Sequence, residues 1–388
     1  MSVLTAIGDD GDSGTRHGEP PAHAEGVSTG SAHAGSAVPL PQSGIAVVRL
    51  SSIGDIVLTE PVIAALRRAY PDAEIAFVVK RRYRELVDAH PDITRVHELR
   101  GSSITGLGRL CSELRSHRYS TVVDLHHNQR SMILGACARA SIVTAYRKRE
   151  PGDAVRVRYR RQAFRASKRL VTRYLDSLRP LGVGGGRDRP RLFVSEASAA
   201  GARDRLSEWG LGDQTFAAVA PAALWSTKRW PVERFAGVAS GLARTQGLDI
   251  LLVGSNADRE LCEDLLRGTD VGSQRVVNAA GRTGLGEFAA ILGAARLFVG
   301  NDSGPMHMAM ARGTPTVAIF GPTDPGQFDF SNDAVIYADL ECSACSFYGT
   351  KTCRLGHWDC MRTISAESVL EAALELLERR PPHGEGME

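Results

Sequence analysis

One stretch near residue 50 limits the possible folds of this chain more than any other. It begins with the mostly apolar, β-branched run Ile45–Leu50, continues with the turn-forming residues Ser51–Gly54, and then has helical apolar spacing over Ile56–Tyr70. Strand, loop and helix in this order are the repeating unit of a parallel α/β sheet. Open α/β sheets bind ligands at the carboxyl ends of their strands, which is where Asp55 falls. Aspartate is also a common helix cap, so this stretch alone leaves both roles open.

A second unit of the same kind lies near residue 300. The apolar strand Arg296–Val299 is followed by Asn301–Gly304, which opens a helix whose free N–H groups and dipole suit a phosphate. His307 lies one turn further along this helix. Asp302 and Ser303 are equally good N-cap residues, and His307 could be a buried core histidine.

Four motifs follow one another along the chain: Arg49–Asp55, Lys228–Pro231, Asn301–His307 and Phe320–Thr323. Together they resemble the ADP-heptose:lipopolysaccharide heptosyltransferase family, glycosyltransferase family 9, over about residues 44–377. The resemblance implies an α/β protein of the GT-B fold, in which two Rossmann-like, doubly wound parallel-sheet domains face a central cleft. No Gly-x-Gly-x-x-Gly motif follows a predicted strand, which argues against a nicotinamide or flavin dinucleotide site.

Strand and helix patterns predict where the two domains lie. In the first half, strands are expected at Ile45–Leu50, Ile75–Val79, Val96–Leu99 and Thr121–Leu125. In the second half, they are expected at Phe216–Ala220, Ile250–Gly254, Val276–Val277, Arg296–Val299 and Thr316–Phe320. The glycine-rich segment Gly182–Pro190 separates the halves. We therefore expect an N-terminal domain over residues 44–187, a linker over 188–212 and a C-terminal domain over 213–362.

The two ends of the chain are expected to lie outside these domains. Residues 1–43 are rich in Gly, Ser, Ala, Pro and His and predict a disordered tail. They lack the basic and apolar regions of a secretory signal, so a cytoplasmic location is expected. Residues 363–388 contain the amphipathic pattern Ser365–Glu378, which predicts a helix. The resemblance implies that this helix packs back toward the N-terminal domain.

The resemblance also implies a division of labour. The N-terminal domain would hold the acceptor, and Asp55 would be the general base that takes the proton of its hydroxyl in a single, inverting displacement. The acceptor-side loop around this acid consists of Ser51, Ser52 and Gly54. The C-terminal domain would bind the sugar nucleotide through Lys228, Asn301, Asp302, Ser303, Gly304 and His307. No cofactor and no catalytic metal are expected.

The charge of the chain limits the partners that it is expected to bind. A net charge of +3 on 388 residues implies no general affinity for polyanions, so nucleic acid is not expected as a partner. No run of residues is long and apolar enough to span a membrane. Basic residues nevertheless gather in the acceptor half at Arg147, Lys148, Arg149, Arg156, Arg158, Arg160, Arg161, Arg165, Lys168 and Arg169. They predict contact with an anionic lipopolysaccharide core or, peripherally, with the cytoplasmic face of the inner membrane, although a solvated face is the alternative.

Four of the seven cysteines lie close together near the C-terminus: Cys342, Cys345, Cys353 and Cys360. A cytosolic chain rarely keeps such a set as disulfides, so a structural zinc or iron–sulfur site is one interpretation. The wide spacing of the second pair does not fit a standard zinc ribbon. The other three, Cys111, Cys137 and Cys262, are scattered along the chain.

These expectations combine in one function: transfer of heptose from ADP-heptose to an inner-core lipopolysaccharide acceptor, either Kdo-lipid A or a heptosyl residue. Family resemblance fixes scaffold and chemistry better than it fixes the sugar, because loop contacts select the substrate. One alternative is a family member that uses another nucleotide sugar and another glycan. The others are a non-catalytic sugar-nucleotide-binding protein and a GT-B-like epimerase that needs no acceptor.

Overall fold

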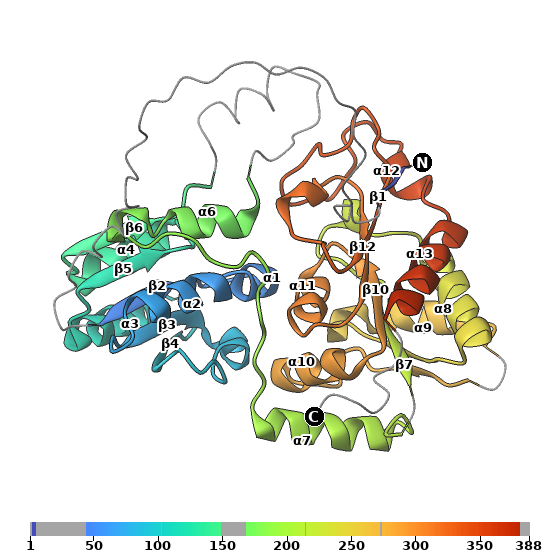
Figure 1. Cartoon of the computed structure of the whole chain (residues 1–388), viewed down its shortest axis with the longest axis horizontal. Coiled ribbons are helices and arrows are strands. Elements are labelled where there is room, and N and C mark those ends of the chain that lie inside the picture. The colour runs from blue at the N-terminus through green and yellow to red at the C-terminus, as the bar shows by residue number, and fades with distance from the viewer. Residues whose placement is uncertain are drawn as a thin grey trace, which may run out of the picture.

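The computed structural model describes residues 44–101, 103–148, 168–213, 215–271 and 274–380, together with the strand Ser2–Leu4. These residues form two α/β domains that stand side by side (Figure 1). Each sheet has buried apolar side chains on both of its faces, where helices cover it. The predicted fold class, two doubly wound parallel-sheet domains, is confirmed. No helix of the described ranges is long and apolar enough to cross a membrane.

The N-terminal domain has a parallel sheet in the order β4-β3-β2-β5-β6. Its strands are β2 (Ile45–Val48), β3 (Ile75–Lys80), β4 (Arg95–Leu99), β5 (Thr121–Asp124) and β6 (Ile142–Ala145). Its helical segments are α1 (Ile53–Val57), α2 (Glu60–Ala69), η1 (Arg81–Leu86), α3 (Ile104–His117), α4 (Gln129–Ala138), α6 (Leu170–Asp176) and η2 (Arg179–Leu181). All four predicted strands are present. The short strand β6 was not predicted.

The C-terminal domain has the sheet order β1-β12-β11-β10-β7-β8-β9, in which only β1 is antiparallel to its neighbour. Its strands are β1 (Ser2–Leu4), β7 (Phe216–Ala220), β8 (Asp249–Leu252), β9 (Val276–Asn278), β10 (Leu297–Asn301), β11 (Thr316–Phe320) and β12 (Ala334–Tyr337). Its helical segments are α7 (Glu196–Glu208), η3 (Ser226–Lys228), α8 (Val232–Gln246), η4 (Asn256–Asp258), α9 (Arg259–Arg267), α10 (Leu285–Ala294), α11 (Gly304–Ala311), η5 (Pro325–Gln327), α12 (Asp359–Arg362) and α13 (Ala366–Arg379). All five predicted strands are present, and β12 was not predicted.

In each sheet the strand order reverses beside the first parallel strand of the domain. β2 lies between β3 and β5, and β7 lies between β8 and β10, so the chain winds outward in both directions from β2 and from β7. At such a switch point the loops that follow the two neighbouring strands diverge and leave a crevice for ligands. The predicted motifs occupy both crevices, because residues 49–55 follow β2, Lys228 follows β7, and residues 301–304 follow β10.

Two of the predicted segments contain secondary structure that was not predicted. The predicted linker, residues 188–212, contains the helix α7, which packs on α10 of the C-terminal domain. This helix is rich in alanine and buries only Ala202 and Leu206. The sequence therefore lacks the regular spacing of large apolar residues that would identify a helix here. Within the predicted disordered tail, Ser2–Leu4 pairs with β12 as an antiparallel strand. Residues 5–43 lie outside the described part of the chain.

The predicted C-terminal helix is present as α13, but its predicted packing is wrong. α13 lies on α8 and on the strands β10 to β12 of its own domain, not against the N-terminal domain (Figure 1). Val369 and Ala373 are fully buried there. Gly241 of α8 permits the close contact, since a Cβ at this position would lie 2.4 Å from a methyl carbon of Leu370. The helix therefore covers the face of the C-terminal sheet that is turned away from the N-terminal domain.

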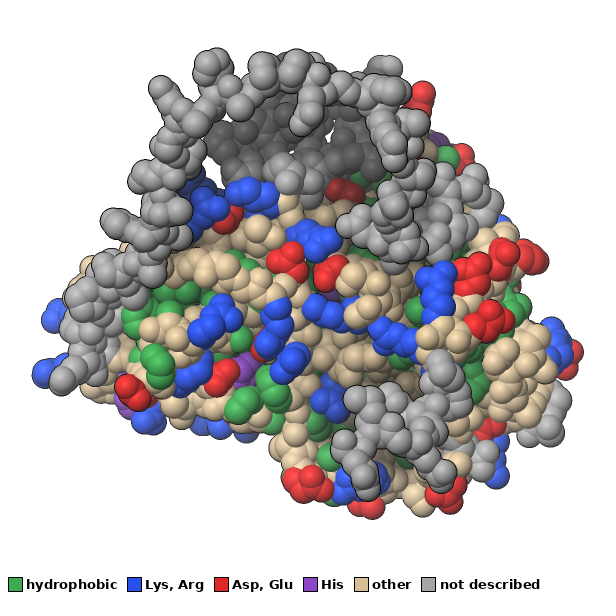
Figure 2. Space-filling model, viewed as in Figure 1, with side chains coloured by type: hydrophobic (Ala, Val, Ile, Leu, Met, Phe, Trp, Pro, Cys, Tyr) green, Lys and Arg blue, Asp and Glu red, His purple; other side chains and the backbone are tan. Residues whose placement is uncertain are grey.

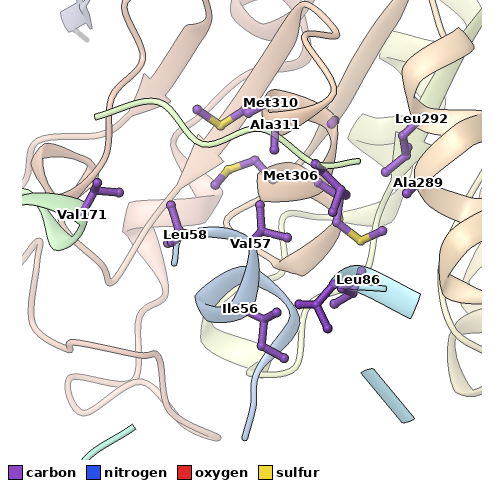
Figure 3. Close-up of a cluster of buried hydrophobic side chains, with 14 of the residues drawn as sticks. Ile56, Val57, Leu58, Leu86, Val171, Ala289, Leu292, Met306, Met310 and Ala311 are labelled. Atoms are coloured by element: carbon purple, nitrogen blue, oxygen red, sulfur yellow. The ribbon is translucent and has the colours of Figure 1, made fainter. Parts of the chain in front are cut away.

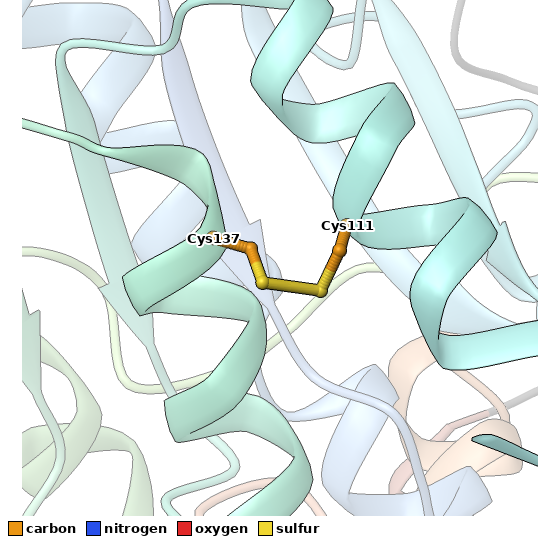
Figure 4. The surroundings of a disulfide bond; sticks show 2 residues. All are labelled: Cys111 and Cys137. Carbon is orange, nitrogen blue, oxygen red and sulfur yellow. A yellow bond between two sulfur atoms is a disulfide. The ribbon is translucent and has the colours of Figure 1, made fainter. Parts of the chain in front are cut away.

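Two of the cysteines that look scattered in the sequence are adjacent in space. Cys111 of α3 and Cys137 of α4 form a disulfide, with their Cα atoms 5.2 Å apart (Figure 4). α3 and α4 lie side by side on one face of the N-terminal sheet. The bond therefore links the two helices that cover this face.

The two domains share one hydrophobic cluster (Figure 3). Ile56, Val57 and Leu58, at α1, pack together with Met306 and Met310 of α11. A polar contact crosses the same boundary, where the Glu85 carboxylate of η1 accepts a hydrogen bond from the backbone N–H of Gly286 (2.7 Å), in the first turn of α10. The helix that carries Asp55 is thus held directly against α11, the helix that follows the motif predicted to bind phosphate.

Candidate functional site

Asp55 lies in the third helical position of α1, and its side chain is about one quarter exposed. Its Oδ2 accepts hydrogen bonds from the backbone N–H of Ser52 (3.2 Å) and from the Ser52 hydroxyl (2.7 Å), and it is paired with Nη2 of Arg49 (2.7 Å). Its Oδ1 accepts a longer bond from the Tyr174 hydroxyl (3.3 Å). The helix-capping alternative is therefore realised, because Ser52 and Asp55 form a capping box. A capping role engages only Oδ2, so it does not exclude chemistry at Oδ1.

Three kinds of interaction act on the ionisation of Asp55. Burial disfavours its charged form, whereas the Arg49 guanidinium and the hydrogen bonds from Ser52 favour it. The balance holds the pKa of Asp55 below its ordinary value. The carboxylate is therefore ionised, and able to accept a proton, across the neutral pH range.

In the C-terminal domain, Lys228 is paired with a residue of the second crevice. Its Nζ donates to Asp302 Oδ2 (2.5 Å), and the Thr323 hydroxyl donates to the same oxygen (2.6 Å). Both side chains of the ion pair are largely buried, with 13% of Lys228 and 6% of Asp302 exposed. Burial tends to raise the pKa of Asp302, but Lys228, His307 and Thr323 together hold it below its ordinary value. The pair with Asp302 thus holds the positively charged Lys228 side chain beside the loop that precedes α11.

Two other residues of the motif Asn301–His307, Asn301 and Ser303, differ in what their side chains contact. The Asn301 side chain is fully buried, and it accepts from the Trp230 N–H (3.1 Å) and donates to the Pro221 carbonyl (2.8 Å). It therefore joins the loops after β7 and β10, and its amide is not open to a ligand. Ser303 is the N-cap of α11, and its hydroxyl finds no hydrogen-bond partner among the described residues.

His307 connects the two halves of the site. Its Nε2 lies 4.0 Å from Asp302 Oδ1, and its ring meets Phe328 edge-on at 4.6 Å. On its other side it packs against Gly54, the residue before Asp55. Burial is the main cause that lowers the pKa of His307, so the ring is neutral at physiological pH.

The contact between Gly54 and His307 leads to a testable prediction. A Cβ at position 54 would lie 2.5 Å from His307 Cδ2, so Gly54→Ala must push α1 and α11 apart. We expect the variant to lose about 1–3 kcal/mol of unfolding free energy and to turn over more slowly. Gly108→Ala is the matched control, because nothing lies within 4 Å of a Cβ there. Thermal unfolding and kcat measure the two effects, and a Gly54→Ala enzyme as active as Gly108→Ala would contradict this interpretation.

An open pocket lies between the domains beside His307. Its lining includes Leu58 and Val171 from the N-terminal side and Met310 and Phe328 from the C-terminal side. Figure 2 shows Lys and Arg side chains gathered along the middle of this face of the molecule, where the domains meet. The candidate site is therefore an interdomain site, and the charged side chains that line its pocket are Arg169, Asp188 and Asp329.

Much of the predicted basic strip lies outside the described residues, namely Arg149, Arg156, Arg158, Arg160, Arg161 and Arg165. Lys168 and Arg169 are engaged within the protein: Lys168 pairs with Asp176 (2.7 Å), and Arg169 pairs with Asp188 (3.1 Å) and Asp329 (3.6 Å). Lys148 interacts with the charges of Asp55 and Arg49, and burial lowers its pKa. In the described part of the strip, Lys148 thus interacts with the charge of Asp55, and Arg169 lines the interdomain pocket.

The four C-terminal cysteines do not form the predicted metal site in this conformation. All four are free thiols, and Cys342 Sγ lies 3.8 Å from His357 Nε2. Within the described ranges, no three His, Cys, Asp or Glu side chains are arranged to hold a metal ion. The pKa of Cys360 is raised to about 12 by burial, so this thiol is protonated.

Three residues of the site were given no role from the sequence. Arg49 offers a signal, because a lone cation in an apolar strand needs a buried partner. Thr323 lies in a recognised motif, but its contact with Asp302 is not evident from the motif. Tyr174 offers no signal at all, since it lies 119 residues from Asp55 in a segment without a motif.

Comparisons with known proteins identify the family of this chain. The family model described as glycosyltransferase family 9 (heptosyltransferase) matches residues 107–358. Lipopolysaccharide heptosyltransferase 3 of Escherichia coli strain K12 is 29% identical over 283 residues, which cover 70% of this chain and 80% of that protein.

Solved structures show the same architecture. A family 9 glycosyltransferase from Veillonella parvula has a TM-score of 0.73 and 25% identity, covering 89% of this chain and 99% of that one. The ADP-heptose lipopolysaccharide heptosyltransferase II of E. coli has a TM-score of 0.67 and 23% identity, covering 87% and 99%. The resemblance drawn from the four motifs is confirmed. Because the family model matches well over half of its residues, the chain belongs to glycosyltransferase family 9, the heptosyltransferase family, and is a glycosyltransferase.

Proposed function

We propose that this enzyme transfers heptose from ADP-heptose to an inner-core lipopolysaccharide acceptor, Kdo-lipid A or a heptosyl residue, with inversion at the anomeric carbon. The observation that carries the proposal is the contact between α1 and α11. It brings a carboxylate from the N-terminal crevice and a cation from the C-terminal crevice to one interdomain site. The names of the relatives point to the same donor and the same class of acceptor.

The proposed reaction is a single displacement. The acceptor hydroxyl oxygen bonds to the anomeric carbon while the bond from that carbon to the diphosphate oxygen breaks, and the hydroxyl proton passes to Asp55. An alcohol has a far higher pKa than an aspartate, so the proton must move during the attack and not before it. General-base help of this kind contributes roughly 10²–10⁴ in rate.

The leaving ADP gains negative charge as the bond breaks. Lys228 would face this charge directly, and the first N–H groups of α11, at Ser303 and Gly304, would add hydrogen bonds and the positive end of the helix dipole. His307, being neutral, would contribute a hydrogen bond and not a charge. No step of this proposal is assigned to a metal ion.

We propose that the acceptor is recognised through its negative charge, with Lys148 as the described residue of the basic strip whose charge interacts with that of the general base. The basic segment that continues beyond it would meet the phosphorylated core or the cytoplasmic face of the inner membrane. The enzyme would then work in the cytoplasm at the membrane surface, where such an acceptor is presented.

The test is the release of ADP from ADP-heptose with and without Kdo-lipid A, with the wild type and Asp55→Ala, in the presence of EDTA. We expect release that requires acceptor, is lost in Asp55→Ala and is insensitive to EDTA. If ADP-heptose is not used, a panel of other nucleotide sugars tests the alternative donor. Donor binding without any turnover would indicate a binding protein, and conversion of the donor without acceptor would indicate an epimerase.

A further inference from the structure

We propose that Arg49 is a positioning residue that holds one oxygen of Asp55, Oδ2, and so leaves the other, Oδ1, to receive the acceptor proton. This inference rests on the proposed function, because it assigns a task to each oxygen of the proposed base. Arg49 itself touches neither substrate, so its effect on the reaction passes through Asp55.

The guanidinium of Arg49 is fixed on three sides. Its Nε donates to the Ser51 carbonyl (2.8 Å), its Nη1 donates to the Leu125 carbonyl at the end of β5, and its Nη2 pairs with Asp55 (2.7 Å). The ring of Tyr174 lies under its central carbon at 5.6 Å. Only 7% of Arg49 is exposed. Arg49 therefore bridges the two strands of the switch point and presents one N–H group to the base.

The two oxygens of Asp55 are not equivalent. Oδ2 has three donors, from Ser52 and Arg49, which exceeds the two lone pairs of a carboxylate oxygen. Oδ1 has one long bond, from the Tyr174 hydroxyl at 3.3 Å. Tyr174 is fully buried, so this bond is released by a local movement of the hydroxyl and not by a movement of the whole side chain. The geometry thus leaves Oδ1 as the oxygen with capacity for an acceptor hydroxyl.

Several elements place charged or titratable groups around Asp55. They are Arg49 after β2, His126 after β5, Tyr146 and Lys148 after β6, Tyr174 of α6 and His307 of α11. Burial opposes the charge of Asp55, and Arg49 is the largest of the influences that favour it. Without the positive charge of Arg49, only the hydrogen bonds from Ser52 remain among these favourable influences, and we expect burial to outweigh them and to raise the pKa of Asp55.

The experiment is the pH dependence of kcat/KM between about pH 5 and about pH 8, a range that lies above the ordinary pKa of aspartate. For the wild type we expect kcat/KM to stay nearly constant toward the acid end of this range. For Arg49→Met we expect kcat/KM to fall toward low pH, with a midpoint at least about one unit above that of the wild type. Arg49→Lys keeps a positive charge and should restore most of the wild-type profile. Arg173→Lys is the matched control: Arg173 is equally buried and stacks on Tyr146 at 5.4 Å, but makes no contact with Asp55.

A second measurement does not depend on turnover. The carboxyl carbon signal of Asp55, assigned by its absence in Asp55→Asn, should titrate at higher pH in Arg49→Met than in the wild type. If Arg49→Met does not fold, the comparison is made with Arg49→Lys, for which a smaller shift in the same direction is expected. An unchanged titration and an unchanged pH profile would overturn the inference. Failure of the wild type to transfer sugar, or full activity of Asp55→Asn, would instead overturn the proposed function.

Discussion

Asp55→Asn is expected to lower kcat by roughly 10²–10⁴ while the Kd for the nucleotide sugar stays near the wild-type value. Asparagine has nearly the shape of aspartate and can still accept at one oxygen, but it cannot take a proton from the acceptor. Asp55 belongs to the N-terminal crevice, whereas Lys228 and the start of α11 belong to the C-terminal one. Steady-state kinetics with saturating acceptor, together with calorimetric titration of the donor, separates the two effects.

The control for this variant is Asp88→Asn. Asp88 lies in the same domain and is paired with Arg84 (2.6 Å) on the surface, so we expect wild-type kinetics from it. An Asp55→Asn enzyme that keeps its kcat would remove Asp55 from the role of general base. A variant with weak donor binding and normal kcat would place this residue in the donor site instead.

The second large effect is expected for Lys228→Met. The variant loses the cation that we propose to face the leaving diphosphate, and the loss of one such contact costs about 10²–10³ in kcat. It also leaves Asp302 buried without its partner, which costs about 3–5 kcal/mol of unfolding free energy for an ion pair broken on one side. Activity assays and chemical denaturation should therefore both detect the change.

A double variant separates these two consequences. In Lys228→Met with Asp302→Asn, no charge remains unpaired, so stability should recover toward the wild-type value while activity stays low. Recovery of activity in the double variant would show that Lys228 serves only to neutralise Asp302. An equal loss of stability in the single and double variants would mean that the pair is not held as the structure shows.

The pH dependence of stability gives a further check on the same pair. In the wild type the pKa of Asp302 is lower in the folded than in the unfolded protein. Its contribution to stability is therefore present above the unfolded pKa of about 3.9, and is lost as the pH falls through the lower folded value. In Lys228→Met the largest influence that lowers this pKa is gone, so we expect burial to raise the folded pKa above the unfolded one and the sign to reverse. The single variant should be closest to the wild type in acid and furthest from it at neutral pH.

Much of the fold can be predicted from the sequence, because the strands of a parallel sheet are buried on both faces and appear as apolar runs. Phe216–Ala220 and Thr316–Phe320 are examples, and both are strands with these bounds. α7 could not be recognised in this way, since it presents few apolar side chains to its neighbour. The position of α13 was mistaken because an amphipathic pattern identifies the apolar face of a helix but not the surface that covers it.

The candidate site shows the same limit. The glycine turn and the helix start identify Asp55 and residues 301–304 as neighbours of ligand crevices, because these positions follow from local order along the chain. The partners of these residues come from far away in the sequence. Lys228 is 74 residues from Asp302, and Tyr174 is 119 residues from Asp55. Contacts at such separations depend on how whole layers pack, and no short motif records them.

The shared hydrophobic cluster at α1 bears on how the protein can be divided. Ile56, Val57 and Leu58 belong to the N-terminal domain by sequence, but part of what covers them is α11 of the C-terminal domain. An isolated fragment over residues 44–187 would present these side chains to water beside Asp55. Each domain therefore completes the interior of the other, so a substitution in either half that changes this common core also changes the packing of its neighbour.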